Sequence, residues 1–152
     1  MMQKELLLIV TCSLMLLQCS GNRPANLGLT GGKLAPCPQS PNCVSSQSES
    51  EKHFIDPLIF SGPLTETREM LVSAIRTVKR AKIVTLENNY IHTEFTSALF
   101  RFVDDGEFYL DEAAHVIHMR SASRLGYSDL GANRKRMESI RDRLVTLQKK
   151  KE

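Results

Sequence analysis

Apolar residues recur at helical spacing in two stretches of the chain, one in its middle and one near its end. The first covers residues 65–80, where apolar side chains follow the i, i+3, i+4, i+7 pattern of a one-sided helix: Leu71, Ala74, Ile75 and Val78. The second begins after Gly131 and runs to about Gln148, with apolar residues three or four positions apart: Met137, Ile140, Leu144 and Leu147. Each helix should therefore pack one face against another layer.

Between the helices the pattern changes to β-branched or alternating runs, which predict strands over residues 82–86, 90–103, 107–111 and 116–124. A bulge near residue 97 would explain a change of face in the second run. Asp104-Asp105-Gly106 is typical of a turn. Residues 58–60 predict a short edge strand, and residues 44–52 an exposed polar arm. Short turns favour antiparallel pairing, so the predicted fold is α+β: an antiparallel sheet of four or five strands with two helices packed on one face.

The N-terminus is typical of an export signal. Residues 6–17 are largely apolar, and a run of about 12 residues is shorter than the roughly 20 that a membrane-spanning helix needs. Residues 1–18 therefore predict a lipoprotein-type signal peptide, and Leu16-Leu17-Gln18-Cys19 resembles a lipobox in which Cys19 is lipidated. Alternatives are lipidation at Cys12, a plain secretory signal, or a buried N-terminal helix.

Composition divides the rest of the chain. Residues 19–36 are rich in Gly, Pro, Asn and Ser and have no apolar period, which predicts a flexible tether. Residues 37–148 form the predicted domain, and residues 149–152 a charged tail. Lipidation would place the protein in the bacterial cell envelope, anchored to a membrane and facing the periplasm or the exterior. The formal net charge of +3 is mild and does not indicate a nucleic-acid partner.

Cys37 and Cys43 bound a proline-containing loop and form an even pair in a chain predicted to be exported. A disulfide between them would close a seven-residue ring and stabilise the fold by about 2.4 kcal/mol in the chain-entropy model. Free thiols are an alternative, and a metal site with His53 is another. A zinc site usually needs four ligands, so we predict the disulfide, no metal and no cofactor.

Residues 116–136 concentrate positive charge around a glycine-containing loop and the predicted start of the last helix. Such a helix start, with nearby arginines, suits an anion, because backbone N–H groups and guanidinium forks both donate to phosphate or carboxylate. The candidate ligand-binding residues are Arg101, Arg120, Arg124, Tyr127, Ser128, Asn133, Arg134 and Arg136. The alternative is structural, with these arginines paired to nearby acids: Asp104, Asp105, Glu107, Asp129 and Glu138.

Three segments together resemble the DUF1499 family, a domain of unknown function. They are CPQSPNCVSSQ at 37–47, IHTEFTSALFRFVDDGEFYLDE at 91–112 and VIHMRSASRLGYSDLGANRKRMESIR at 116–141. The resemblance covers residues 37–147, and it departs from the family at Gly106 and His115. It implies a self-contained domain of an exported, lipoprotein-like chain, and it carries over no catalytic residues.

These observations favour an envelope lipoprotein whose small domain binds an anionic small molecule, a lipid headgroup or an envelope protein through the arginine-rich stretch. One alternative is a structural or assembly module with the arginines in internal salt bridges. Another is an enzyme that uses His92 or His118 with Asp104. No HExxH, GxSxG or P-loop motif is present, so we predict no catalytic residues.

Overall fold

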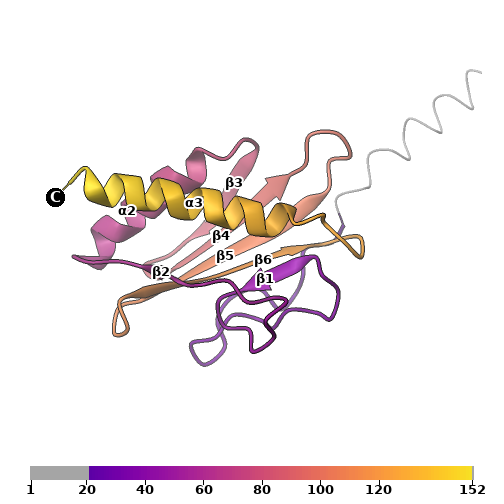
Figure 1. The fold of residues 1–152 in the computed structure, drawn as a ribbon, viewed down its shortest axis with the longest axis horizontal. Helices are drawn as coiled ribbons and strands as arrows, with labels where there is room; N and C mark the ends of the chain where they lie inside the picture. The colour runs from indigo at the N-terminus through magenta and orange to yellow at the C-terminus, as the bar shows by residue number, and fades with distance from the viewer. Residues whose placement is uncertain (1–20, 152) are drawn as a thin grey trace, which may run out of the picture.

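A computed structural model describes residues 21–151 of the chain. Along this part the elements follow the order β1 (Cys43–Ser45), β2 (Leu58–Ile59), α2 (Leu64–Arg76), β3 (Ala81–Leu86), β4 (Tyr90–Thr96), β5 (Val103–Asp111), β6 (Val116–Ser123) and α3 (Ala132–Lys149) (Figure 1). The predicted signal peptide and Cys19 lie outside the described residues. Within residues 21–151, no helix combines the length and the apolar character needed to cross a membrane.

The strands form one antiparallel sheet in the order β1-β6-β5-β4-β3, and β2 pairs with the start of β6. This confirms the predicted α+β fold, with six strands described rather than four or five. The additional strand is β1, which lies where an exposed polar arm was predicted. Its three residues are buried because β1 pairs along β6, with Val44 opposite Ser121.

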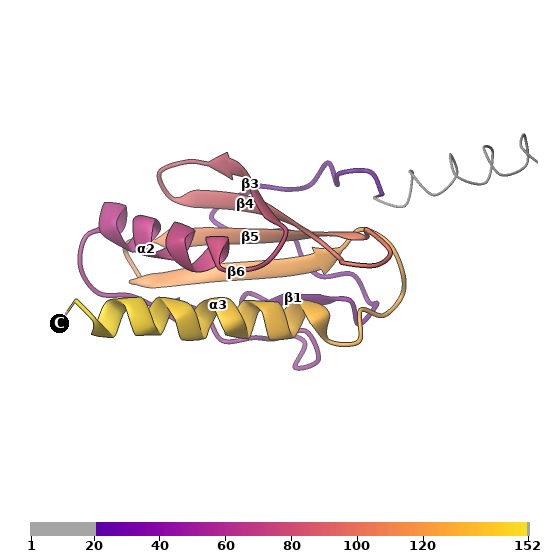
Figure 2. The ribbon, with the colours of Figure 1, turned by 90° about the horizontal axis from the view of Figure 1, so that it is seen from above.

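One face of the sheet is apolar and is covered by both helices, which Figure 2 shows from above. Alternation along the strands gives this face its buried apolar residues: Ile91, Phe95, Phe108, Leu110, Ile117 and Met119. They pack in one core with apolar residues of α2 and α3 that include Leu71, Ile75, Met137 and Ile140. The predicted helix faces are therefore the ones that contact the sheet.

Helix α2 ends at Arg76 rather than at residue 80, and it begins at Leu64, after the cap residue Pro63. The chain turns directly afterwards, and Arg80 adopts a left-handed backbone conformation with φ of 60° before β3 starts at Ala81. The early end of the helix is thus set by the short connection to β3.

The predicted turn at Asp104-Asp105-Gly106 is wrong, because these residues lie inside the long strand β5 and are buried. The turn lies earlier, between Thr96 and Val103, where the sequence predicted only a bulge. Both carboxylates are accommodated in the sheet by cationic partners. Gly106 is accommodated by its lack of a side chain, since the ring of Phe95 packs directly over it.

The N-terminal strap, defined here as residues 21–39, lies on the sheet face opposite the helices (Figures 1 and 2). Arg23 bonds to Glu94, the backbone N–H of Gly28 donates to Glu107, and that of Leu34 donates to Gln47. A flexible tether was predicted for residues 19–36, and the part of it that the structure describes, residues 21–36, belongs to the folded unit.

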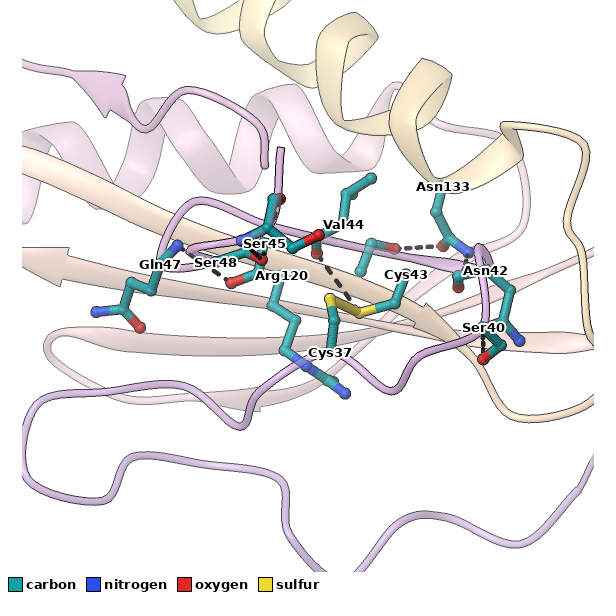
Figure 3. The surroundings of a disulfide bond; sticks show 12 residues. Cys37, Ser40, Asn42, Cys43, Val44, Ser45, Gln47, Ser48, Arg120 and Asn133 are labelled. Carbon is teal, nitrogen blue, oxygen red and sulfur yellow. Dashed lines mark hydrogen bonds between the residues drawn. A yellow bond between two sulfur atoms is a disulfide. The ribbon is translucent and has the colours of Figure 1, made fainter. Parts of the chain in front are cut away.

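A disulfide joins the strap to the sheet and confirms the predicted pairing of Cys37 with Cys43. The two Cα atoms lie 5.7 Å apart, an ordinary separation for a disulfide. Figure 3 shows the bond beside Arg120, at the point where the strap enters β1. The disulfide thereby fixes the C-terminal end of the strap against the polar face of the sheet.

Candidate functional site

The polar face of the sheet carries a network of ionisable side chains beneath the strap. Strand alternation puts His92 and Glu94 of β4 on this face beside Asp105 of β5, and Arg124 follows the end of β6. The guanidinium of Arg124 donates to both oxygens of Asp105, at 2.8 and 2.7 Å, and to Glu94 Oε1 at 2.6 Å. Arg23 of the strap donates to the same Glu94 oxygen. The arginine thus bridges two carboxylates with good bidentate geometry.

These contacts set the charge state of the network. Burial alone would raise the pKa of Asp105, but hydrogen bonds from Arg124 and His92 outweigh it and hold that pKa below its usual value. The pKa of Glu94 is also lowered, since bonds from Arg23 and Arg124 outweigh its partial burial. Bonds to the two carboxylates raise the pKa of Arg124, so it stays a cation.

Acid is therefore expected to weaken the fold through Asp105 and Glu94. Their folded-state pKa values are lowered, from unfolded values of about 3.9 and 4.3. The stabilisation is complete above the unfolded values and is lost as pH falls through the folded ones. Urea unfolding between neutral pH and pH 3 measures this loss. A variant with Asp105→Asn and Glu94→Gln should show a shallower acid decline, and an unchanged decline would contradict the prediction.

Arg120 is the second buried cation on this face. Its Nη1 donates to Glu107 Oε2 at 3.1 Å, and the other oxygen of Glu107 accepts from the Tyr90 hydroxyl and from the backbone N–H of Gly28, each at 2.8 Å. Burial, followed by the charge of Glu107, raises the pKa of Tyr90, which keeps the phenol protonated as a donor. Glu107 therefore ties β4, β6 and the strap together.

Two other predicted ligand-binding residues, Asn133 and Arg136, belong to α3 and contact the face of the sheet that the helices cover. Arg136 donates to Asp104 Oδ2 at 2.7 Å, and its guanidinium carbon lies 4.6 Å from the centre of the Phe95 ring. Asn133 is fully buried at the start of α3 and is bonded to Ser121, Ser123, Asn42 and Arg136. These bonds join α3 to β5 and β6, so both residues are occupied by contacts that hold the layers together.

The remaining predicted residues lie near one end of the sheet and do not meet in one site. Arg101, Tyr127 and Ser128 are exposed in loops, and Arg134 donates to the backbone oxygen of Lys52. The predicted set thus divides between the two faces of the sheet and the loops. The sequence shows how these cations cluster along the chain, but it does not reveal the strand register that separates them.

The histidines proposed for catalysis are placed differently from the prediction. His92 Nε2 lies 2.8 Å from Asp105, whereas Asp104 is on the opposite face of the sheet and bonds to Arg136. His118 Nδ1 lies 3.2 Å from the hydroxyl of Ser46, and burial lowers its pKa. The expected pairing of either histidine with Asp104 is therefore wrong. Within residues 21–151, no three His, Cys, Asp or Glu side chains are grouped so as to hold a metal ion.

A cleft of about 920 Å³ opens between the strap and residues 45–53. Three further hollows measure 440 to 520 Å³ each. Gln47 links the two segments that form the cleft. Its side-chain oxygen accepts a hydrogen bond from the backbone N–H of Leu34, and its side-chain nitrogen donates to the Gly32 carbonyl. This cleft has no signature in the sequence, since its walls are irregular segments brought together by the disulfide and by β1.

The cleft contains basic groups and one buried imidazole. Lys33 and Lys52 line it and are exposed, and Glu49 is the acidic residue on its wall. His53 also lines the cleft, is 7% exposed, and has no hydrogen-bond partner for Nε2 among the described residues. Buried polar atoms normally have a partner, and this nitrogen is itself closed off from solvent.

Fold and site together define a small α+β domain whose polar sheet face is neutralised by internal ion pairs and covered by a disulfide-linked strap. Residues 33–144 match the model of a family described as "Protein of unknown function (DUF1499)", and the chain belongs to this family. No curated protein matches the chain. The first twelve residues of the strap, 21–32, precede the matched span.

Proposed function

We propose that this domain is a binding module for a small anionic ligand, held in the cleft between the strap and residues 45–53. The cleft itself is the observation that carries the proposal. Its volume of about 920 Å³ lies within the range of about 300–1,000 Å³ typical of small-molecule sites. A concave site between two segments can surround a small ligand.

The charges around the cleft favour an anion. The ammonium groups of Lys33 and Lys52 outnumber the carboxylate of Glu49. An anionic group between the two lysines would gain charge-assisted hydrogen bonds. Phosphate and carboxylate compounds are therefore the ligand classes to test first.

The ion pairs favour a second candidate, a structural or assembly module. Three arginines of the predicted binding stretch already contact carboxylates, at distances of 2.6 to 3.1 Å: Arg120, Arg124 and Arg136. An arginine with a buried carboxylate partner is poorly available to an external anion, because binding would require breaking the existing pair. These arginines support the fold in either candidate function. An enzyme is not part of the proposal.

We further propose that the chain is exported and membrane-attached, as a lipoprotein modified at Cys19. The Cys37–Cys43 disulfide supports export, because such bonds persist in oxidising compartments. Mass spectrometry of the N-terminus tests this proposal. A chain that begins at acylated Cys19 would support it, and an unprocessed chain recovered from the producing bacterium would contradict it.

Charge reversal in the cleft is expected to weaken anion binding. Isothermal titration with inorganic phosphate, nucleotides and dicarboxylates should find a ligand for the wild-type chain. For that ligand, the double variant Lys33→Glu/Lys52→Glu should raise Kd about tenfold or more. Each tenfold increase corresponds to a loss of about 1.4 kcal/mol of binding free energy. The matched control is Lys149→Glu/Lys150→Glu, which changes the net charge equally at the far end of α3. Equal weakening in both variants would contradict a site in the cleft.

A further inference from the structure

Two loops at the same end of the sheet expose most of the large apolar side chains found on the described surface. The loops are residues 97–102, between β4 and β5, and residues 124–131, between β6 and α3 (Figure 1). Antiparallel pairing brings them together, and the backbone N–H of Arg124 donates to the Val103 carbonyl. Residues 21–151 include ten exposed large apolar residues, and six of them are in these loops: Leu99, Phe100, Phe102, Leu125, Tyr127 and Leu130.

The exposure of these residues is high for their size. Leu130 is 89% exposed, Leu99 78%, Tyr127 73% and Phe100 63%. The side chains lie at loop tips rather than on a strand or helix face, so no layer of this domain covers them. Grouped apolar exposure of this kind usually marks a surface that meets a partner or a membrane.

The described chain also begins at this end. A Cβ atom on Gly21 would lie 2.9 Å from Cβ of Arg124 and 3.0 Å from Cγ of Leu125, so the strap starts against the second loop. The residues that precede Gly21 include the apolar run at 6–17 and Cys19. Any attachment of the N-terminus to a membrane would therefore hold these two loops toward that membrane, because only one residue separates Cys19 from Gly21.

Basic residues surround the apolar tips. Arg101 stands between Phe100 and Phe102 and is exposed. Exposed Lys79, Arg80 and Lys135 line a neighbouring hollow beside Thr96 and Ser97. Apolar and aromatic tips flanked by cations match the boundary between acyl chains and anionic headgroups, where Tyr, Arg and Lys are favoured.

We propose that this end of the domain, residues 97–102 and 124–131, is a membrane-contact surface that inserts its apolar tips into an anionic phospholipid bilayer. The proposal rests on the membrane attachment of the N-terminus proposed above. It adds a fixed orientation: the loops face the lipid, and the opposite end of the sheet faces away from it. A soluble protein or a second copy of the chain as the occupant of this surface is the opposing outcome.

The absence of tryptophan from the sequence allows a direct test with single-tryptophan variants of the full chain. The variants are Phe100→Trp and Tyr127→Trp in the loops, and Leu86→Trp as a control. Leu86 is also an exposed apolar residue, but it lies at the opposite end of the sheet, beside the β3–β4 turn. The chain is reconstituted with vesicles of phosphatidylethanolamine and phosphatidylglycerol that carry brominated acyl chains.

Flotation of the vesicles is measured first, and then tryptophan fluorescence. We expect the chain to float, Phe100→Trp and Tyr127→Trp to be quenched with emission at shorter wavelength, and Leu86→Trp to be unquenched. A chain that does not float would overturn both the attachment and the contact surface. A floating chain in which the three reporters behave alike would overturn the contact surface alone. Emission at shorter wavelength from position 100 or 127, without quenching by bromine, would mean that a protein covers this surface. That result also overturns the proposal.

Discussion

Replacing Arg124 with alanine is expected to lower the free energy of unfolding by about 3–5 kcal/mol, the usual cost of removing one partner of a buried ion pair. Side-chain exposure is 7% for Arg124 and 1% for Asp105. The substitution therefore leaves one buried carboxylate with only His92 as its partner, and it leaves Glu94 with Arg23 alone. Urea unfolding at neutral pH measures the loss.

The control for this effect is Arg143→Ala, which removes an arginine from the exposed side of α3. Surface changes of this kind usually stay within about 0.5 kcal/mol. The double variant Arg124→Ala/Asp105→Asn should lose less than the sum of the single changes, since it removes both members of the pair. An Arg124→Ala chain as stable as Arg143→Ala would show that Arg124 is not a structural residue.

Gly106→Ala is expected to destabilise the domain by about 1–3 kcal/mol, the usual cost of overpacking a core. A Cβ atom at this position would lie 2.4 Å from Cε2 of Phe95 and 3.3 Å from Cε of Met137. Phe95 is 1% exposed and lies in the centre of the core, so its ring has no free space to enter. The requirement for glycine is therefore spatial, at the crossing of β5, β4 and α3.

A compensating change tests whether the ring of Phe95 causes the loss of stability, or whether β5 tolerates no substitution at this position. Phe95→Leu removes the part of the ring nearest to Gly106, so Gly106→Ala should cost less in a Phe95→Leu chain than in the wild type. Thermal unfolding of the four chains of this double-mutant cycle gives the coupling between the positions. Additive losses would mean that the ring does not cause the effect.

The sequence predicted the helices well because their apolar residues repeat on one face over several turns. The strand signals were also sufficient for β3, β6 and the short β2. Asp104-Asp105-Gly106 misled the prediction, because local preference favours a turn while tertiary contacts hold these residues in β5. Arg136 neutralises one carboxylate and Arg124 the other, and neither partner is close in sequence.

The candidate site was harder to predict than the fold. A shift of one residue in strand register would move Asp105 to the other face of the sheet, so the sequence alone could not pair it with Arg124. The strap has no apolar repeat, and its position depends on single contacts such as Gly28 with Glu107. The cleft depends in turn on the strap, which is why Lys33, Lys52 and His53 carried no sequence signal of a shared site.

Amide chemical shifts of the domain show where on the chain a small anion binds. The isotope-labelled chain is titrated with the anion that binds most tightly in calorimetry. We predict that the perturbed amides lie in residues 30–39 and 45–53, on the two walls of the cleft. Perturbations confined to residues 116–136 would contradict the claim, because they would place the ligand on the arginine-rich stretch whose cations are here assigned to the fold.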